Sequence, residues 1–353
     1  MADILRNMLS FCVKSEGSDL YIYSDARPMI KIHGECQHLS TSPLSLAQVG
    51  QIVSRLLTPQ QQEQFEEEME LSTSVTFEDI GRFRINVFRE RGKPTVVARL
   101  IKGDIPAIEE LDLPSVLGKL SLEKRGLVLV VGATGQGKST TLAAMIKHRA
   151  AKKNGHIICI EDPIEFIHSH DRSLIGQREI GVDTRNYNTA LKNAMRESPD
   201  AIMIGEILDE ETMSSAIKFA DTGHLCLATL HAVNANQALD RIINMYPESL
   251  HDHVRQDLAM NLKAIISMRL PKGVNGKRVP VVEVMLNTPH VQDLIRKGHI
   301  EELKEAILES IDDGGQSFDH ALYQMVREEK IDQHEALRWA DSATDLSLRL
   351  RFD

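Results

Sequence analysis

A glycine-rich loop between an apolar strand and a helix restricts this chain to a small group of folds. Residues 127–131 read LVLVV and run directly into GATGQGKST, which ends at Thr140 and matches the pattern GxxxxGK[ST]. Glycines let the backbone turn tightly so that its N–H groups point at phosphates, and the helix that follows adds a positive N-terminal end. The segment predicts a P-loop in an α/β domain.

The P-loop motif assigns roles to individual side chains. The ammonium of Lys138 is expected to neutralise the β- and γ-phosphates of ATP, and the hydroxyl of Ser139 is expected to bind Mg²⁺. The alternative is a turn that contains glycines by chance, which the preceding strand and following helix disfavour. The predicted nucleotide contacts are Gly132, Thr134, Gly135, Gln136, Gly137, Lys138, Ser139 and Thr140.

A second apolar run ends in a glycine and a carboxylate. Residues 201–204 read AIMI and are followed by Gly205 and Glu206, an arrangement of Walker B form. In α/β sheets, ligands collect at the carboxyl ends of the strands, so Glu206 is expected to reach the Mg²⁺ shell directly or through water. The alternative is a surface glutamate that follows a core strand.

Three carboxylates crowd the segment after another apolar run. Residues 160–165 read IEDPIE, about 25 residues after the P-loop. Carboxylates placed close together repel one another and favour uptake of a proton, which suits a general base that polarises water. We assign that role to Glu165, and the alternative is charge solvated on a loop.

Two histidines bracket the apolar run LCLATL. Seven residues of extended chain separate His224 from His231 by roughly 23 Å at about 3.3 Å per residue, so they are poor joint metal ligands. A histidine at the strand end could sense the γ-phosphate, although a lone histidine is more often satisfied within the core. His231 is therefore a candidate for the catalytic site.

Transfer of a phosphoryl group also needs a guanidinium to stabilise negative charge, from the same or a neighbouring subunit. Arg84 is the arginine that we assign to this role, although most surface arginines only keep a surface hydrated. The other candidates are Arg82, Arg89, Arg91 and Arg99 near it, and Arg178, Arg196 and Arg241 near the carboxylate motifs.

The length of 353 residues favours two domains. We expect an α+β domain over 1–101, a linker over 102–114 that contains Gly103, Pro106 and Pro114, an ATPase domain over 115–288 and a helical region over 289–353. In the first domain, periodicity predicts one helical stretch over 46–69 and strands over 20–23, 29–32, 72–77, 82–88 and 96–101. In the second domain, buried parallel strands are expected over 127–131, 157–160, 201–204 and 225–228, with a later strand at VVEVML.

Composition disfavours several other classes of protein. A net charge of -10 disfavours broad affinity for nucleic acid, because phosphate backbones bind positive surfaces. The four cysteines form no CxxC pair, so neither a zinc site nor a thioredoxin-like site is indicated. No segment approaches the roughly 20 apolar residues of a membrane span, and we expect a cytoplasmic protein.

Four motifs in a fixed order connect the chain with a known family: GATGQGKSTT, IEDPIEF, AMRESPDAIMIGEILD and TGHLCLATLHAVNA. Together they resemble the secretion ATPases of the PilT/PilU type. The resemblance implies a PAS-like first domain, a RecA-like second domain, a homo-hexameric ring and retraction of type IV pili. It also implies that Glu165 is the catalytic glutamate, Glu206 the Walker B glutamate, and His224 and His231 the histidine box, with Arg84 in the domain that supplies arginines to a neighbouring subunit.

Departures from the family pattern refine this interpretation. Gln136 stands where the family usually has serine, a change expected to be tolerated because the position presents mainly its backbone. Residues 289–296 read PHVQDLIR in place of AIRNLIR, and the extended C-terminal sequence resembles the PilU type, an accessory motor. The implied partners are a PilT-type ATPase and the pilus platform protein, at the cytoplasmic side of the inner membrane. The alternatives are an ATP-binding regulatory partner with little hydrolysis and a nucleic-acid motor.

Overall fold

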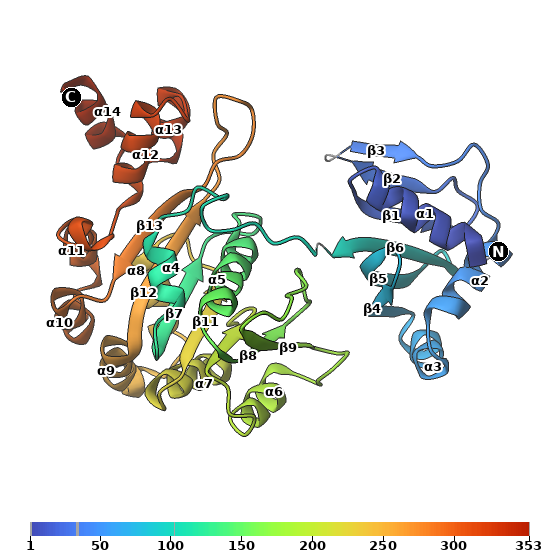
Figure 1. Cartoon of the computed structure of the whole chain (residues 1–353), viewed down its shortest axis with the longest axis horizontal. Coiled ribbons are helices and arrows are strands. Elements are labelled where there is room, and N and C mark those ends of the chain that lie inside the picture. Colours follow the sequence, from blue (N-terminus) through green and yellow to red (C-terminus); the bar gives the residue numbers. More distant parts are fainter. Residues whose placement is uncertain (1, 33–34, 102, 353) are drawn as a thin grey trace. The chain divides into compact units, whose positions relative to one another are not determined.

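The computed structural model describes residues 2–32, 35–101 and 103–352, which form two compact units (Figure 1). The first unit comprises Met1–Asp104 with Glu165–Ile167, and the second comprises Ile105–Ile164 with His168–Asp353. Lys102, where the predicted linker begins, lies outside the described residues.

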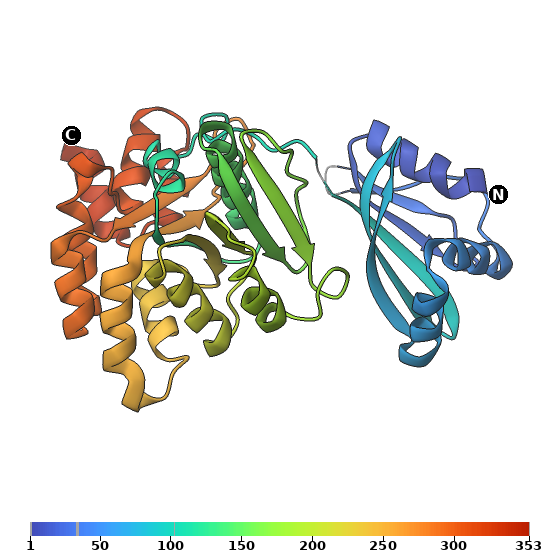
Figure 2. The ribbon, with the colours of Figure 1, turned by 60° about the horizontal axis from the view of Figure 1, so that its bottom comes forward.

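The first unit is an antiparallel sheet whose core lies against helices (Figure 2). Its strand order is β3-β2-β1-β6-β5-β4. The helix α1 (Ala2–Lys14) contacts β1, and the core side chains alternate along β5 and β6 as expected for a sheet with one buried face. The strands are β1 (Gly17–Tyr23), β2 (Met29–Ile32), β3 (Glu35–His38), β4 (Glu70–Phe77), β5 (Gly81–Glu90) and β6 (Lys93–Ile101).

The single helical stretch predicted over 46–69 is wrong, because the structure has two helices there. These are α2 (Leu46–Leu56) and α3 (Pro59–Glu68). Thr58 is extended and accepts a hydrogen bond from the backbone N–H of Gln61, whose side chain accepts one in return from the backbone of Thr58. This capping box, with a proline as the first helical residue, starts a new helix at that point.

The second unit is built on a seven-stranded sheet of order β13-β12-β7-β11-β10-β8-β9. All neighbouring strands are parallel except β12 and β13, which are antiparallel. The four predicted parallel strands and the later one are confirmed, whereas β9 and β12 had not been predicted. The strands are β7 (Gly126–Val131), β8 (Gly155–Glu161), β9 (Ser173–Glu179), β10 (Ala201–Ile204), β11 (Leu225–Leu230), β12 (Leu262–Arg269) and β13 (Val281–Leu286).

Helices cover both faces of this sheet. One apolar core joins the sheet to α4 (Val116–Ser121) and α5 (Lys138–Lys152). The core on the opposite face joins the sheet to a larger set of helices. These include α6 (Tyr187–Ala194), α7 (Glu210–Asp221), α8 (Ala235–Ile243) and α9 (His251–Asn261), with a 3-10 turn at Glu248–Leu250.

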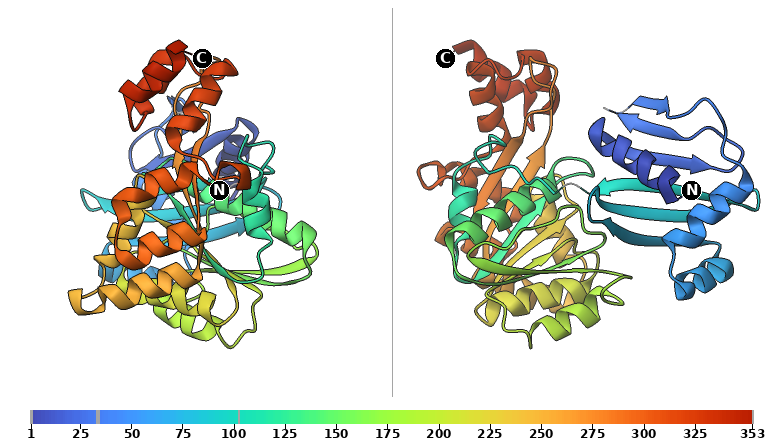
Figure 3. Two further views of the ribbon diagram at one scale, coloured as in Figure 1. Left: turned by 90° about the vertical axis from the view of Figure 1, so that its left-hand side faces the viewer. Right: turned by 45° about the vertical axis from the view of Figure 1, so that its right-hand side comes forward.

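The C-terminal region is helical, as predicted. Its last three helices pack around a small core that includes Val281 of β13 and Phe318. Figure 3 shows these helices, in red, close together near the C-terminus. The helices are α10 (Pro289–Lys297), α11 (Leu303–Leu308), α12 (Phe318–Arg327), α13 (Gln333–Trp339) and α14 (Ala343–Phe352), with 3-10 turns at Ile300–Glu302 and Ile311–Asp313. Within the described parts of the chain, none of the helices has the length and apolar character needed to cross a membrane.

Candidate nucleotide site

The sheet of the second unit brings four of the sequence motifs to one edge. The strands β7, β11, β10 and β8 are adjacent and parallel, so their carboxyl ends point the same way. The P-loop follows β7, His231 follows β11, Glu206 follows β10, and Glu161 ends β8. Ligands of α/β proteins bind at this edge of the sheet, so the topology favours one site built from these segments.

The P-loop has the backbone conformation that its glycines allow. Gly132 has a φ of 157°, and a Cβ there would lie 2.9 Å from the backbone oxygen of Met268. Gly137 caps α5 with a φ of 87°, in the left-handed region that side chains disfavour. The loop therefore leads directly into the N-terminus of α5, where free backbone N–H groups attract anions.

Lys138 is the buried cation of this loop, with 9% of its surface exposed. Its Nζ donates hydrogen bonds to the carbonyl oxygens of Gly132 at 2.8 Å and Ala133 at 3.1 Å. A buried ammonium must be held by acceptors, and two of them lie in the loop itself. Ser139 and Thr140 occupy the first turn of α5 and are half-buried, so all the predicted nucleotide contacts lie in one continuous segment.

Gln136 contacts the end of β12 through its side chain. Its Oε1 accepts a hydrogen bond from the backbone N–H of Leu270 at 2.6 Å. The expectation that this position presents mainly its backbone is therefore wrong. A serine side chain is two heavy atoms shorter. The loop pattern, which usually has serine at this position, therefore could not predict this hydrogen bond.

Arg278 is a second contact to the loop that sequence reasoning missed. Its guanidinium donates a hydrogen bond to the carbonyl oxygen of Gly135 at 3.1 Å. The residue lies in the connection between β12 and β13, close to Gly276, which has a positive φ of 78°. A basic residue beside a turn glycine was the only local signal for it.

A hollow of about 370 Å³ lies beside the P-loop. Leu111, Met268 and Leu270 supply apolar walls, and Thr140 and Arg278 supply polar groups. Apolar walls with a few polar groups at fixed positions are typical of small-molecule sites. The hollow is therefore a candidate small-molecule site next to the P-loop.

Glu206 and His231 meet at the carboxyl edge of the sheet. The Oε1 atom of Glu206 lies 2.5 Å from Nε2 of His231, and both side chains are partly exposed. The guanidinium of Arg241 donates a hydrogen bond to the backbone oxygen of His231 at 2.9 Å. The spacing of the two histidines left the role of His231 open, and the structure places its side chain against Glu206, the predicted Walker B carboxylate.

His224 lies at the other end of β11. Its Nδ1 is 3.1 Å from the hydroxyl oxygen of Thr222, and its ring meets the edge of the Phe219 ring. The two histidines of the box therefore occupy opposite ends of one strand. Among the residues that the structure describes, no group of three or more His, Cys, Asp or Glu side chains is arranged to hold a metal ion.

Gly205 allows the ends of β10 and β8 to approach closely. A Cβ at this position would lie 3.1 Å from the Cα of Glu161 and 3.2 Å from the hydroxyl oxygen of Tyr187. Glu161 is buried and accepts a hydrogen bond from the side chain of Gln177 at 3.0 Å. Burial raises the pKa of Tyr187, and the nearby carboxylates of Asp162 and Glu161 raise it further. Sequence reasoning did not identify Tyr187.

Two further predicted residues, Glu165 and Arg84, fall in the first unit, whereas the candidates Arg178 and Arg196 lie in the second. Glu165 is exposed and belongs to the segment Glu165–Ile167, and Arg84 lies half-buried on β5. The P-loop and Glu206 belong to the second unit. The roles of Glu165 as general base and Arg84 as phosphate-binding cation therefore stay predictions.

Comparison with known proteins decides the family. The model of the family described as "Type II/IV secretion system protein" matches residues 1–338. The chain belongs to this family. Its fold is that of the secretion ATPases, with an α+β unit, an α/β unit and a helical C-terminal region, and the resemblance found in the motifs is confirmed.

Individual members of the secretion family are similar over nearly the whole chain. The chain is 48% identical to the type IV pilus ATPase PilU of Pseudomonas aeruginosa over 98% of its length and 90% of that protein. It is 36% identical to the type IV pilus retraction ATPase PilT of the same organism, over 94% of this chain and 96% of that one. The crystal structure of the pilus retraction motor PilT with bound ADP superposes with a TM-score of 0.91 at 31% identity, covering 99% of each chain.

Proposed function

We propose that this chain is an ATPase that powers retraction of type IV pili and thereby twitching motility, as an accessory motor of the PilU type. The observation that carries the proposal is the 48% identity to PilU over 98% of the chain. The P-loop, the Glu206–His231 pair and the hollow beside the loop supply the chemistry that such an enzyme needs.

The nucleotide would bind with its phosphates on the P-loop and its base in the hollow. The N–H groups at the start of α5 and the ammonium of Lys138 attract the phosphates, and Lys138 exchanges the carbonyls of Gly132 and Ala133 for phosphate oxygens. Arg278, held at the carbonyl of Gly135, lies at the wall of the hollow. Lys138 acts from the first residue of α5, and Arg278 acts from the connection between β12 and β13.

Mg²⁺ fits the donor set at this edge of the sheet. The hydroxyl of Ser139, in the first turn of α5, and the carboxylate of Glu206 would hold it, since hard cations prefer oxygen ligands. When bound, Mg²⁺ neutralises charge on the phosphate oxygens. The imidazole of His231 lies beside this carboxylate, with its Nε2 2.5 Å from Oε1 of Glu206.

Hydrolysis requires an attacking water and charge stabilisation. Glu165 accepts the proton of the water that attacks the γ-phosphorus, and the bond to the leaving oxygen of ADP breaks to release phosphate. Arg84 of a neighbouring subunit stabilises the charge on the transferred group. His231 responds to the γ-phosphate through its contact with Glu206.

The assembly that uses this chemistry would be a homo-hexamer at the cytoplasmic side of the inner membrane. It would act peripherally on the pilus platform protein and beside a PilT-type ATPase. The net charge of -10 favours protein partners over nucleic acid.

Steady-state ATPase activity of the purified chain, with light scattering to follow its oligomeric state, tests the proposal. Lys138→Ala should nearly abolish turnover, while Lys152→Ala, an exposed lysine at the end of α5, should leave it unchanged. The proposal is supported if the wild-type chain is a hexamer with ATPase activity, and if Lys138→Ala loses that activity while Lys152→Ala keeps it. Nucleotide binding without turnover in the wild-type chain would instead favour a regulatory partner of a PilT ring.

A further inference from the structure

A buried carboxylate lies on β13, a strand that carries none of the sequence motifs. Glu283 is on β13 and only 3% of its surface is exposed. Its neighbours Val282 and Val284 are apolar, and burial raises its pKa. Placing an ionisable group in a core costs free energy that an apolar residue would not. Packing alone therefore does not explain why a glutamate occupies this position.

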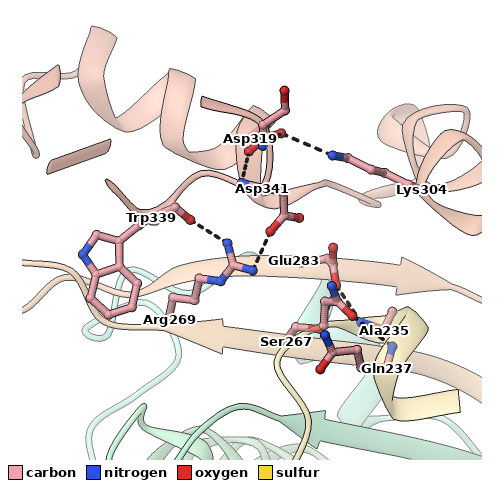
Figure 4. A network of polar contacts seen from close by, with 11 residues as sticks. Ala235, Gln237, Ser267, Arg269, Glu283, Lys304, Asp319, Trp339 and Asp341 are labelled. Atoms are coloured by element: carbon pink, nitrogen blue, oxygen red, sulfur yellow. Dashed lines mark hydrogen bonds and ion pairs between the residues drawn. The ribbon is translucent and has the colours of Figure 1, made fainter. Parts of the chain in front are cut away.

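Two hydrogen bonds to Glu283 end on the same oxygen. Its Oε1 accepts from the backbone N–H of Ala235 at 2.9 Å and from the hydroxyl of Ser267 at 2.8 Å (Figure 4). Ser267 lies directly opposite Glu283 in the pairing of β12 with β13, which accounts for the second bond. The first bond joins the strand to a different element.

Ala235 is the first residue of α8, so Glu283 binds the N-terminus of that helix. The preceding Asn234 accepts a hydrogen bond from the backbone N–H of Gln237 at 2.9 Å. Two of the free N–H groups at this helix end thus have acceptors, and the positive end of the helix favours a carboxylate. Glu283 holds the start of α8 against β13.

The helix in turn fixes the backbone of His231. Only residues 232–234 separate His231 from the start of α8. Arg241, near the other end of α8, donates its hydrogen bond to the carbonyl of His231. The histidine is therefore held at two points by a helix whose N-terminus is held by Glu283, and its imidazole contacts Glu206.

We propose that Glu283 is a positioning residue that holds His231 against Glu206 through the N-terminus of α8. It sets the rate of hydrolysis without touching the nucleotide. The inference rests on the proposed ATPase function, and it adds a residue that lies outside all four sequence motifs.

The C-terminal helices attach beside the same carboxylate. Arg269 of β12 donates hydrogen bonds to the backbone oxygen of Trp339 at 2.6 Å and to Asp341 at 2.6 Å (Figure 4). The charge of Arg269 lowers the pKa of Glu283, while that of Asp341 raises it, although burial has the larger effect. The environment that positions α8 therefore includes the junction with the C-terminal region.

The test compares Glu283→Leu with Glu283→Gln in the full-length chain. Leu removes the acceptor, and we expect kcat to fall about tenfold or more while the nucleotide Kd changes less than about twofold. Gln retains an oxygen that can accept both hydrogen bonds, so its kcat should stay within about threefold of wild type. Val284→Ala, on the same strand but in the core of the opposite face, is the control for lost stability.

A double-mutant cycle with His231→Ala asks whether Glu283 acts through the histidine. We expect the double variant Glu283→Leu with His231→Ala to match His231→Ala alone within about twofold. The proposal would be overturned if the losses of kcat in the two single variants multiplied in the double variant. Full activity of His231→Ala, or a loss in Glu283→Gln equal to that in Glu283→Leu, would also overturn it. If Glu283→Leu does not fold, Ser267→Ala takes its place, with an expected loss of about two- to fivefold, and unchanged activity would overturn the proposal.

Failure of the proposed function has a different signature. A wild-type chain without ATPase activity, or one whose activity survives Lys138→Ala, would overturn the ATPase assignment itself. Normal wild-type activity that is lost with Lys138 but unaffected by Glu283→Leu would overturn only the role of Glu283.

Discussion

Glu206 and His231 join the ends of two neighbouring parallel strands, with Oε1 of the glutamate 2.5 Å from Nε2 of the histidine. The strands β10 and β11 place the two residues at the same edge of the sheet as the P-loop. One histidine of the predicted histidine box, His231, thus contacts Glu206, the predicted Walker B carboxylate. A change to either residue should affect the other.

Replacing the Glu206 carboxylate should weaken the use of Mg²⁺. Glu206→Gln removes a charged oxygen ligand, and we expect kcat to fall by about 10²-fold and the Mg²⁺ concentration for half-maximal activity to rise. A Mg²⁺ titration of ATPase activity at fixed ATP measures both effects. Glu210→Gln, an exposed carboxylate in the first turn of α7, is the control. An unchanged Mg²⁺ dependence would assign the ligand elsewhere.

Replacing the predicted general base should separate binding from hydrolysis. Glu165→Gln should keep nucleotide affinity and slow hydrolysis by roughly 10²-fold or more, because the amide cannot accept the proton of the attacking water. A fluorescent nucleotide measures affinity, and phosphate release measures turnover. Asp171→Asn, also exposed, should turn over normally. Normal turnover of Glu165→Gln would show that the base assignment is wrong.

Removing the Gln136 side chain should loosen the P-loop. Gln136→Ala leaves the backbone N–H of Leu270 without its acceptor, and we expect nucleotide affinity to fall about two- to tenfold. Gln136→Glu retains an acceptor oxygen and so tests whether charge or the hydrogen bond matters. Titration calorimetry of both variants with ADP gives the comparison. If Gln136→Ala binds ADP with unaltered affinity, the hydrogen bond between Gln136 and Leu270 is not needed for nucleotide binding.

His168 should make stability depend on pH. Burial lowers its pKa from 6.5 to about 4, so the unfolded chain binds more protons than the folded chain between those values. The free energy of unfolding therefore falls as pH decreases from about 6.5 to about 4, by roughly 3 kcal/mol from this group. The contribution is fully present above about pH 6.5.

Denaturation curves at pH 7 and pH 5 measure this effect. His168→Phe should lose less stability between the two pH values than the wild-type chain does. His253→Gln, whose imidazole is 73% exposed, should behave as the wild type. An equal pH dependence in His168→Phe would mean that other groups carry it.

Local features of the sequence were sufficient for much of the fold. The strands β7, β8, β10 and β11 were predictable because a strand buried on both faces is a continuous apolar run. Strand β9 was not, since SLIGQRE lies at the sheet edge and mixes polar with apolar residues. The break between α2 and α3 was signalled by Thr58 and Pro59, and the helical periodicity on either side outweighed that signal.

The P-loop could be located from adjacent residues because its glycines, lysine and serine act within one turn of chain. The contacts that other segments make with the P-loop could not be predicted in this way. Gln136 and Leu270 are far apart in sequence, as are Arg278 and Gly135, and no periodicity predicts a hydrogen bond between such residues.

The P-loop, the apolar strands and the family could be recognised without a structure, since each depends on neighbouring residues or on motifs in order. The contact between Glu206 and His231, and the hydrogen bond from the N-terminus of α8 to Glu283, became visible only in the folded chain. These contacts join residues on different elements, so they depend on strand order. Parallel strands can neighbour one another in several orders with similar apolar patterns, and only the packed sheet selects which carboxyl ends lie side by side.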